Sequence, residues 1–89
     1  MLRRKVTIVN KLGLHARAAA KLVQLAGGYE SEIRIQRGAA EANAKSIMGV
    51  MMLAAGRGSE LDLTIEGPDE TQAADAVERL IADRFGEDE

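Results

Sequence analysis

Strict alternation of apolar and polar residues in three short segments is the feature that most limits how this chain can fold. The alternation is clearest at Leu61, Leu63 and Ile65, which are separated by polar residues. The three segments are 2–9, 30–36 and 61–66, and a weaker fourth lies at 41–44. A strand with one apolar face needs cover on one side only, which is typical of antiparallel sheets. The pattern therefore predicts a sheet with one polar face.

Three further segments have helical periodicity, at 16–26, 47–55 and 70–85. In the first we expect Ala19, Leu22, Val23 and Ala26 to face the core, with Lys21 and Gln24 pointing outward. In the last the expected core stripe is Ala73, Ala74, Val77, Leu80, Ile81 and Phe85. The order βαββαβα predicts an α+β fold, an open-faced sandwich in which three helices cover one face of a four-stranded antiparallel sheet. We expect residues 86–89 to be a frayed acidic tail.

Size and composition exclude several classes of protein. A chain of 89 residues has room for one core, so we expect a single domain over residues 1–89. Without cysteine, and with one histidine, the sequence predicts no disulfide, no metal site and no cofactor. No apolar run approaches the ~20 residues of a membrane span. The N-terminus lacks a signal-peptide core, so we expect a cytoplasmic protein without membrane insertion. A net charge of -2 and two aromatic residues, Tyr29 and Phe85, argue against nucleic acid as a partner.

The charges are divided unevenly along the chain. Residues 1–29 contain six Lys or Arg and no acid, whereas Asp and Glu dominate from Glu66 onward. The basic end could steer a phosphorylated or acidic partner toward the residues around it. The alternative is an ordinary solvated face, and charge alone does not separate the two.

His15 is the strongest candidate for chemistry. It is the only histidine, and it stands between a polar turn at 10–13 and the predicted helix that begins at Ala16. The first N–H groups of a helix, here those of Ala16 and Arg17, are unpaired and bind anions. The Arg17 guanidinium adds planar donors that suit phosphate oxygens. The arrangement suits phosphoryl transfer through an imidazole nitrogen, and the residue types alone leave a purely structural histidine and a solvated Arg17 as the alternative.

Two segments resemble the signatures of the histidine-containing phosphocarrier (HPr) family of the bacterial phosphoenolpyruvate-dependent phosphotransferase system. They are Gly-Leu-His-Ala-Arg at 13–17 and Lys-Ser-Ile-Met-Gly-Val-Met-Met-Leu at 45–53. The resemblance implies the spatial strand order 1-4-2-3, a phosphoryl group on His15 and assistance from Arg17. It also implies Enzyme I as donor, an Enzyme IIA protein as acceptor, and a covalently modified carrier rather than an independent enzyme.

Ala18 departs from the commonest family pattern, which has proline after the arginine. Proline suits the first turn of a helix, but alanine is a strong helix former, so we expect the helix to survive. Nitrogen-regulatory relatives (NPr) also carry His-Ala-Arg-Ala-Ala. The resemblance therefore leaves open whether the acceptor belongs to the sugar branch or the nitrogen branch.

Ser46 precedes the second predicted helix and is a natural N-cap. The resemblance implies that Ser46 is a regulatory site phosphorylated by HPr kinase/phosphorylase. This leaves a second functional hypothesis, a regulatory binding module that acts through Ser46 and the adjacent apolar surface without a main role in transport.

The segment after Ser46 is too apolar for every side chain of a short helix to be buried. We expect Val50 and Leu53 to be core residues, and Ile47, Met48 and Met51 to form an exposed patch that meets partners. Ala16, Ala20 and Lys21 would extend this docking surface beside His15. The alternative is that the whole segment is core.

Overall fold

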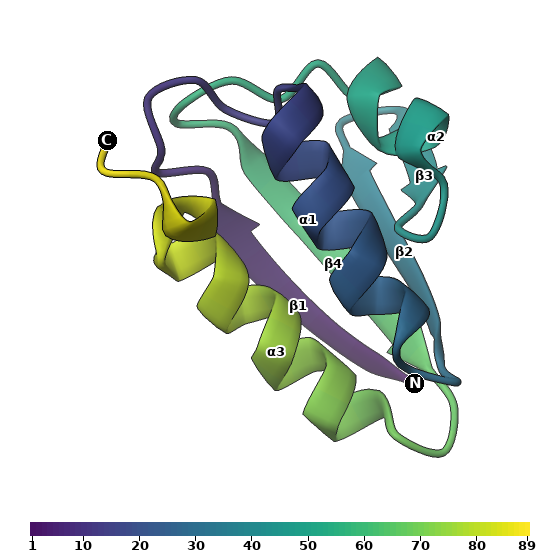
Figure 1. Ribbon diagram of the computed structural model, residues 1–89. Helices are drawn as coiled ribbons and strands as arrows, with labels where there is room; N and C mark the ends of the chain where they lie inside the picture. The colour runs from purple at the N-terminus through teal and green to yellow at the C-terminus, as the bar shows by residue number, and fades with distance from the viewer.

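The computed structural model describes all residues, Met1–Glu89, and has helices packed on one face of a twisted sheet (Figure 1). The elements are β1 (Leu2–Thr7), α1 (Ala16–Gly27), β2 (Glu32–Arg37), β3 (Ala40–Asn43), α2 (Ile47–Met52), β4 (Glu60–Glu66), α3 (Glu70–Ala82) and the short 3-10 turn η1 (Arg84–Gly86). The predicted order βαββαβα and the open-faced α+β sandwich are confirmed. None of the helices combines the length and the apolar character that crossing a membrane requires.

The four strands form one antiparallel sheet in the order β1-β4-β2-β3, which is the order that the resemblance implied. In the register, Val6 lies opposite Leu61 and Ile35 lies opposite Leu63. Apolar side chains of neighbouring strands therefore reach the same face of the sheet. Their polar neighbours, such as Arg34 and Asp62, point to the uncovered face.

The core lies between the apolar face of the sheet and the helices. It contains 21 buried residues, among them Ile33, Ile35, Leu61, Leu63 and Ile65, which are fully buried. Burying one such side chain contributes about 1.5–3 kcal/mol, so these strands are a main source of stability. The helices present mostly alanine to the sheet, and the small side chains allow a close approach: Ala18, Ala19, Ala26, Ala73 and Ala74 are all fully buried.

Both later helices end earlier than the sequence predicted. Helix α2 stops at Met52 instead of Ala55, and Ala54 then takes a left-handed conformation with φ of 52°. Helix α3 stops at Ala82 instead of Phe85, and Arg84 and Phe85 have φ of 56° and 55°. The Phe85 side chain is nevertheless fully buried, and its burial stabilises a backbone conformation that side chains disfavour. The chain therefore reverses direction after α3.

The prediction of a frayed acidic tail is wrong. After the reversal, residues 86–89 run back to the loop between β1 and α1, where the C-terminus lies in Figure 1. Glu87 is bonded to Asn10 and His15, and the Lys11 backbone N–H donates to the Glu89 carbonyl at 2.5 Å. The acidic end of the sequence thus lies against its basic beginning.

Candidate functional site

His15 is placed by the loop that enters α1. It is the N-cap of the helix, with φ of -73° and ψ of 177°, and its carbonyl accepts the Ala19 N–H at 2.8 Å. Its side chain does not cap the helix, and 29% of it remains exposed. The ring is therefore partly accessible at the end of the helix.

Gly13 fixes this loop against the segment that follows α2. Its φ is 66°, and a Cβ there would stand 2.5 Å from the Ala55 carbonyl oxygen and 2.7 Å from Cα of Gly56. The same Ala55 oxygen accepts the Leu14 N–H at 2.8 Å. Only glycine allows this close approach without strain, so the residue two before His15 holds the loop against Ala55 and Gly56.

The start of α1 offers unpaired donors beside the ring. The backbone N–H groups of Ala16, Arg17 and Ala18 precede the first intrahelical hydrogen bond and have no protein acceptor. The Arg17 side chain is exposed and makes no hydrogen bond or ion pair. Three N–H groups at the positive end of a twelve-residue helix, together with an exposed guanidinium, have the chemistry to bind an oxyanion. The three sequence-predicted groups, the His15 ring, the adjoining backbone and Arg17, thus lie together.

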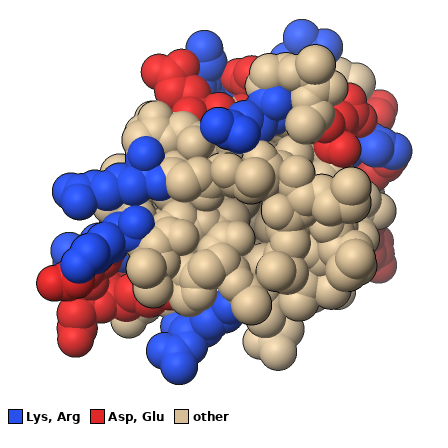
Figure 2. All heavy atoms as spheres, turned by 90° about the horizontal axis from the view of Figure 1, so that it is seen from above, with Lys and Arg blue, Asp and Glu red and all other residues tan.

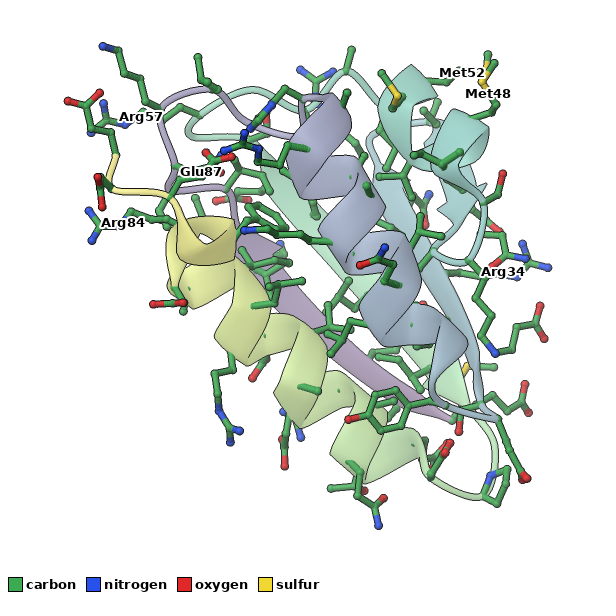
Figure 3. All side chains as sticks on the ribbon, in the orientation of Figure 1. Arg34, Met48, Met52, Arg57, Arg84 and Glu87 are labelled. Carbon is green, nitrogen blue, oxygen red and sulfur yellow. The ribbon has the colours of Figure 1, made fainter.

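Glu87 contacts His15 from the other side. Its carboxylate is hydrogen-bonded to Nε2 of the ring, and its Oε1 accepts from Nδ2 of Asn10 at 3.0 Å. Figure 3 shows Glu87 between the C-terminal segment and the start of α1. Only 14% of the side chain is exposed. Two hydrogen bonds lower the pKa of Glu87, and the one from Asn10 has a larger effect than the one from His15. The carboxylate is therefore ionised at neutral pH.

Lys21 does not point freely outward, as the sequence had suggested. Its ammonium donates to the Phe85 carbonyl oxygen at 2.6 Å, which satisfies a backbone group exposed by the reversal after α3. Lys21 is therefore tied to the C-terminal segment and is only half exposed. The pocket around His15 is formed by the loop after β1, the start of α1 and the C-terminal segment: Lys11, Leu12, His15, Ala16, Arg17, Glu87, Asp88 and Glu89.

Ser46 is the N-cap of α2, which carries the predicted patch and packs beside α1. The Ser46 hydroxyl accepts the Gly49 N–H at 3.2 Å, the N-cap contact expected from the sequence. Val50 and Leu53 are buried, whereas Ile47, Met48 and Met51 are exposed, as the sequence analysis expected.

Met52, which the predicted patch omitted, is the most exposed of the large apolar side chains at 77%. Met48 and Met52 extend from the outer end of α2 in Figure 3. Figure 2 views the end that carries α2 and the start of α1, and it shows a broad central area without charged side chains. Ala16 is exposed and Ala20 half exposed on the neighbouring helix.

Asn10 and Glu87 are the site residues that sequence reasoning missed. Asn10 lies in the polar turn before His15 and is fully buried, although nothing in a turn sequence indicates burial. Glu87 lies 72 residues from His15, in an acidic segment that reads as a tail. No group of three or more His, Cys, Asp or Glu side chains is arranged to hold a metal ion.

Comparison with known proteins gives a consistent result. Residues 2–83 match the family described as "PTS HPr component phosphorylation site". Over 89 residues, the whole of both chains, the sequence is 61% identical to phosphocarrier protein HPr of Cupriavidus necator. It is 50% identical over 88 residues to phosphocarrier protein HPr of Treponema pallidum, covering 99% of this chain and 100% of the relative. The fold matches the crystal structure of HPr from Thermoanaerobacter tengcongensis with a TM-score of 0.96, at 43% identity and with full coverage of both chains.

Proposed function

Because the chain belongs to the HPr family and is a phosphocarrier of the phosphotransferase system, we propose that His15 is the residue that carries the phosphoryl group. His15 is the only histidine of the chain, and it stands at the N-terminus of α1 beside unpaired N–H groups. That juxtaposition is the observation that carries the proposal. An imidazole nucleophile and an oxyanion site have to be adjacent for the group to be accepted and held.

The reacting nitrogen is Nδ1, because Nε2 is hydrogen-bonded to Glu87. In the forward step the Nδ1 lone pair forms a bond to phosphorus as the bond between phosphorus and the donor group breaks. The N–H groups of Ala16 and Arg17 then receive the phosphoryl oxygens, and the Arg17 guanidinium supplies positive charge. Transfer to an acceptor reverses these steps and restores the neutral ring. The protein contributes position and electrostatics, which is the usual division in phosphoryl transfer.

The test uses Enzyme I with phosphoenolpyruvate as donor. We expect one acid-labile phosphoryl group per chain, and none on His15→Ala. Labelling of that variant would overturn the assignment. Arg17→Ala should leave the melting temperature unchanged, since the side chain has no partner, and should slow transfer roughly 100-fold. Arg57→Ala is the matched control, because Arg57 is also exposed and unpaired but does not line the His15 pocket. Equal rates for the two variants would refute the role of Arg17.

The docking surface for Enzyme I and Enzyme IIA proteins is the apolar end of the molecule. It combines Ile47, Met48 and Met51 with Ala16 and Ala20, and we add Met52 because of its exposure. Methionine suits a surface that meets several partners in turn. Lys21 contributes at its edge, although its ammonium is held by Phe85. The relay would operate in the cytoplasm, and the acceptor assay should include Enzyme IIA proteins of the sugar and nitrogen branches.

Ser46 is the proposed regulatory site, with HPr kinase/phosphorylase as the modifying enzyme. Its hydroxyl caps α2 and lies directly before the exposed apolar residues. A phosphate there would sit favourably at the helix N-terminus but would place negative charge beside the docking surface. This observation also supports the second candidate function, a regulatory binding module acting through Ser46 and that surface. Purified kinase with ATP should modify the protein but not Ser46→Ala, and modification of that variant would remove Ser46 from this role.

A further inference from the structure

Asn10 is a fully buried side chain whose orientation is set by two acceptors. Its Nδ2 donates to the Gly13 carbonyl oxygen at 2.9 Å and to Oε1 of Glu87 at 3.0 Å. Turning the amide over would place its oxygen against both of these oxygens, so the donor side has to face them. Asn10 thereby connects the glycine that sets the His15 loop to the carboxylate that meets the His15 ring.

Glu87 is consequently held on two sides. Asn10 donates to one oxygen of its carboxylate, and the other oxygen meets Nε2 of His15. An ionised carboxylate can only accept, so the Nε2 that meets it has to carry the hydrogen. In a neutral imidazole one nitrogen carries the hydrogen and donates, and the other has a lone pair and accepts. A hydrogen-bond partner at one nitrogen therefore decides which form the other nitrogen takes. Nδ1 is then left with its lone pair free.

We propose that Glu87, oriented by Asn10, is a positioning residue for phosphoryl transfer, holding His15 in the Nε2–H tautomer so that Nδ1 is the nucleophile. The proposal rests on the proposed phosphorylation of His15. The Nε2 proton stays on the ring throughout, while the Nδ1–P bond forms and the bond from phosphorus to the donor breaks. The ring gains positive charge in that step, which the adjacent carboxylate stabilises, and it returns to neutrality when the phosphoryl group leaves.

Two substitutions of Glu87 separate this role from a merely structural one. Glu87→Ala removes the acceptor and leaves the tautomer to the ring itself. In Glu87→Gln the amide oxygen has to face Asn10, because Nδ2 of Asn10 can only donate. The Gln NH₂ group then faces Nε2 of His15 as a donor, which favours the Nδ1–H tautomer and blocks the nucleophile. A structural role predicts that the isosteric Gln is the milder change, whereas the positioning role predicts that it is the more harmful one.

Glu60→Gln is the matched control. Glu60 lies on β4, is 66% exposed and pairs only with Lys5, at 3.9 Å, and it does not line the His15 pocket, so its substitution removes the same charge away from the ring. Thermal unfolding of the three variants checks that each is folded at the assay temperature.

The experiment combines two measurements on protein with ¹⁵N-labelled histidine. Ring ¹⁵N chemical shifts at pH 9, where an ordinary imidazole is neutral, give the ratio of the two tautomers. Single-turnover phosphorylation by Enzyme I gives the transfer rate. We expect the wild type and Glu60→Gln to hold the Nε2–H form. The tautomer ratio should fall roughly tenfold in Glu87→Ala, the effect of losing one charge-assisted hydrogen bond, and should invert in Glu87→Gln. Transfer should be slower in Glu87→Ala and slowest in Glu87→Gln.

An unchanged tautomer ratio in Glu87→Ala, or a Glu87→Gln variant that transfers at least as fast as Glu87→Ala, would overturn the proposal. Either result could occur while the wild type is still phosphorylated on His15, so the phosphocarrier assignment would stand. Failure of the wild type to accept a phosphoryl group on His15 would overturn that assignment instead, because the tautomer ratio is measured without any phosphoryl donor.

Discussion

Aspartate should destabilise the protein strongly at one position of α2, Val50, and hardly at all at another, Met48. Val50 is fully buried, so Val50→Asp removes an apolar contribution of about 1.5–3 kcal/mol. It also places an unpaired carboxylate in the core, which costs several kcal/mol more. Because a domain of this size is stable by only about 5–15 kcal/mol, a loss of about 5 kcal/mol approaches its whole stability. At about 4–8 °C per kcal/mol, the melting temperature should fall by at least ~20 °C.

Met48 is 68% exposed, and Met48→Asp should change stability by no more than about 0.5 kcal/mol, or ~4 °C. A carboxylate in the first turn of α2 is also favourable to the helix dipole, so a small rise is within the expectation. Binding should respond differently. A charge placed in the apolar centre of an interface typically costs about 2 kcal/mol, so the affinity for Enzyme I should fall ~30-fold.

Circular dichroism melting and calorimetric titration with Enzyme I measure the two effects. Gln72→Asp is a suitable control, because it adds the same charge at an exposed position of α3, away from α2. A drop of more than ~8 °C for Met48→Asp would show that the side chain contributes to the core. If Met48→Asp kept its full stability and its full affinity for Enzyme I, α2 would not be part of the interface. A stable Val50→Asp would contradict the packing argument itself.

Three further predictions concern the cap, the loop and acid stability. Ser46→Ala should lose about 1 kcal/mol of capping in thermal unfolding. Ser46→Asp should keep that stability but slow phosphorylation by Enzyme I, and equal stopped-flow rates would exclude a charge effect on docking. Gly13→Ala forces a Cβ to within 2.5 Å of the Ala55 oxygen at a φ of 66°, and should cost at least about 2 kcal/mol in urea unfolding. The pKa of Asp69 is lowered by hydrogen bonds from the hydroxyl of Ser31 and from backbone N–H groups. Its ionised carboxylate therefore stabilises the folded state fully at pH values above the ordinary pKa of 3.8. That contribution is lost as the pH falls through the lower pKa of the folded state. A carboxylate with a lowered pKa takes up its proton roughly between pH 5 and 2, so over this range the stability of Asp69→Asn should decline less than that of the wild type. Parallel acid profiles would refute this role.

Local pattern determined much of this protein. The alternation around Leu61, Leu63 and Ile65 predicts half-buried strands, because successive side chains of a strand point to opposite faces. The Gly-Leu-His-Ala-Arg segment placed His15 at a helix start, and Ser46 was recognised as a cap, since both depend on residues within one turn. Strand order was not determined in this way. Which strands pair is a contact between distant segments, and here it came only from the family resemblance.

The tertiary structure alone decided what surrounds the His15 ring. Arg84 and Phe85 adopt a left-handed backbone that their own side chains disfavour, so no local rule predicts the reversal after α3. Burial of the Phe85 ring in the core offsets that strain and directs residues 86–89 back toward the N-terminal loop. The sequence showed a basic beginning and an acidic end. Only folding brought Glu87 to His15 and Asn10, because the contacts that hold them together join residues more than 70 positions apart in the sequence.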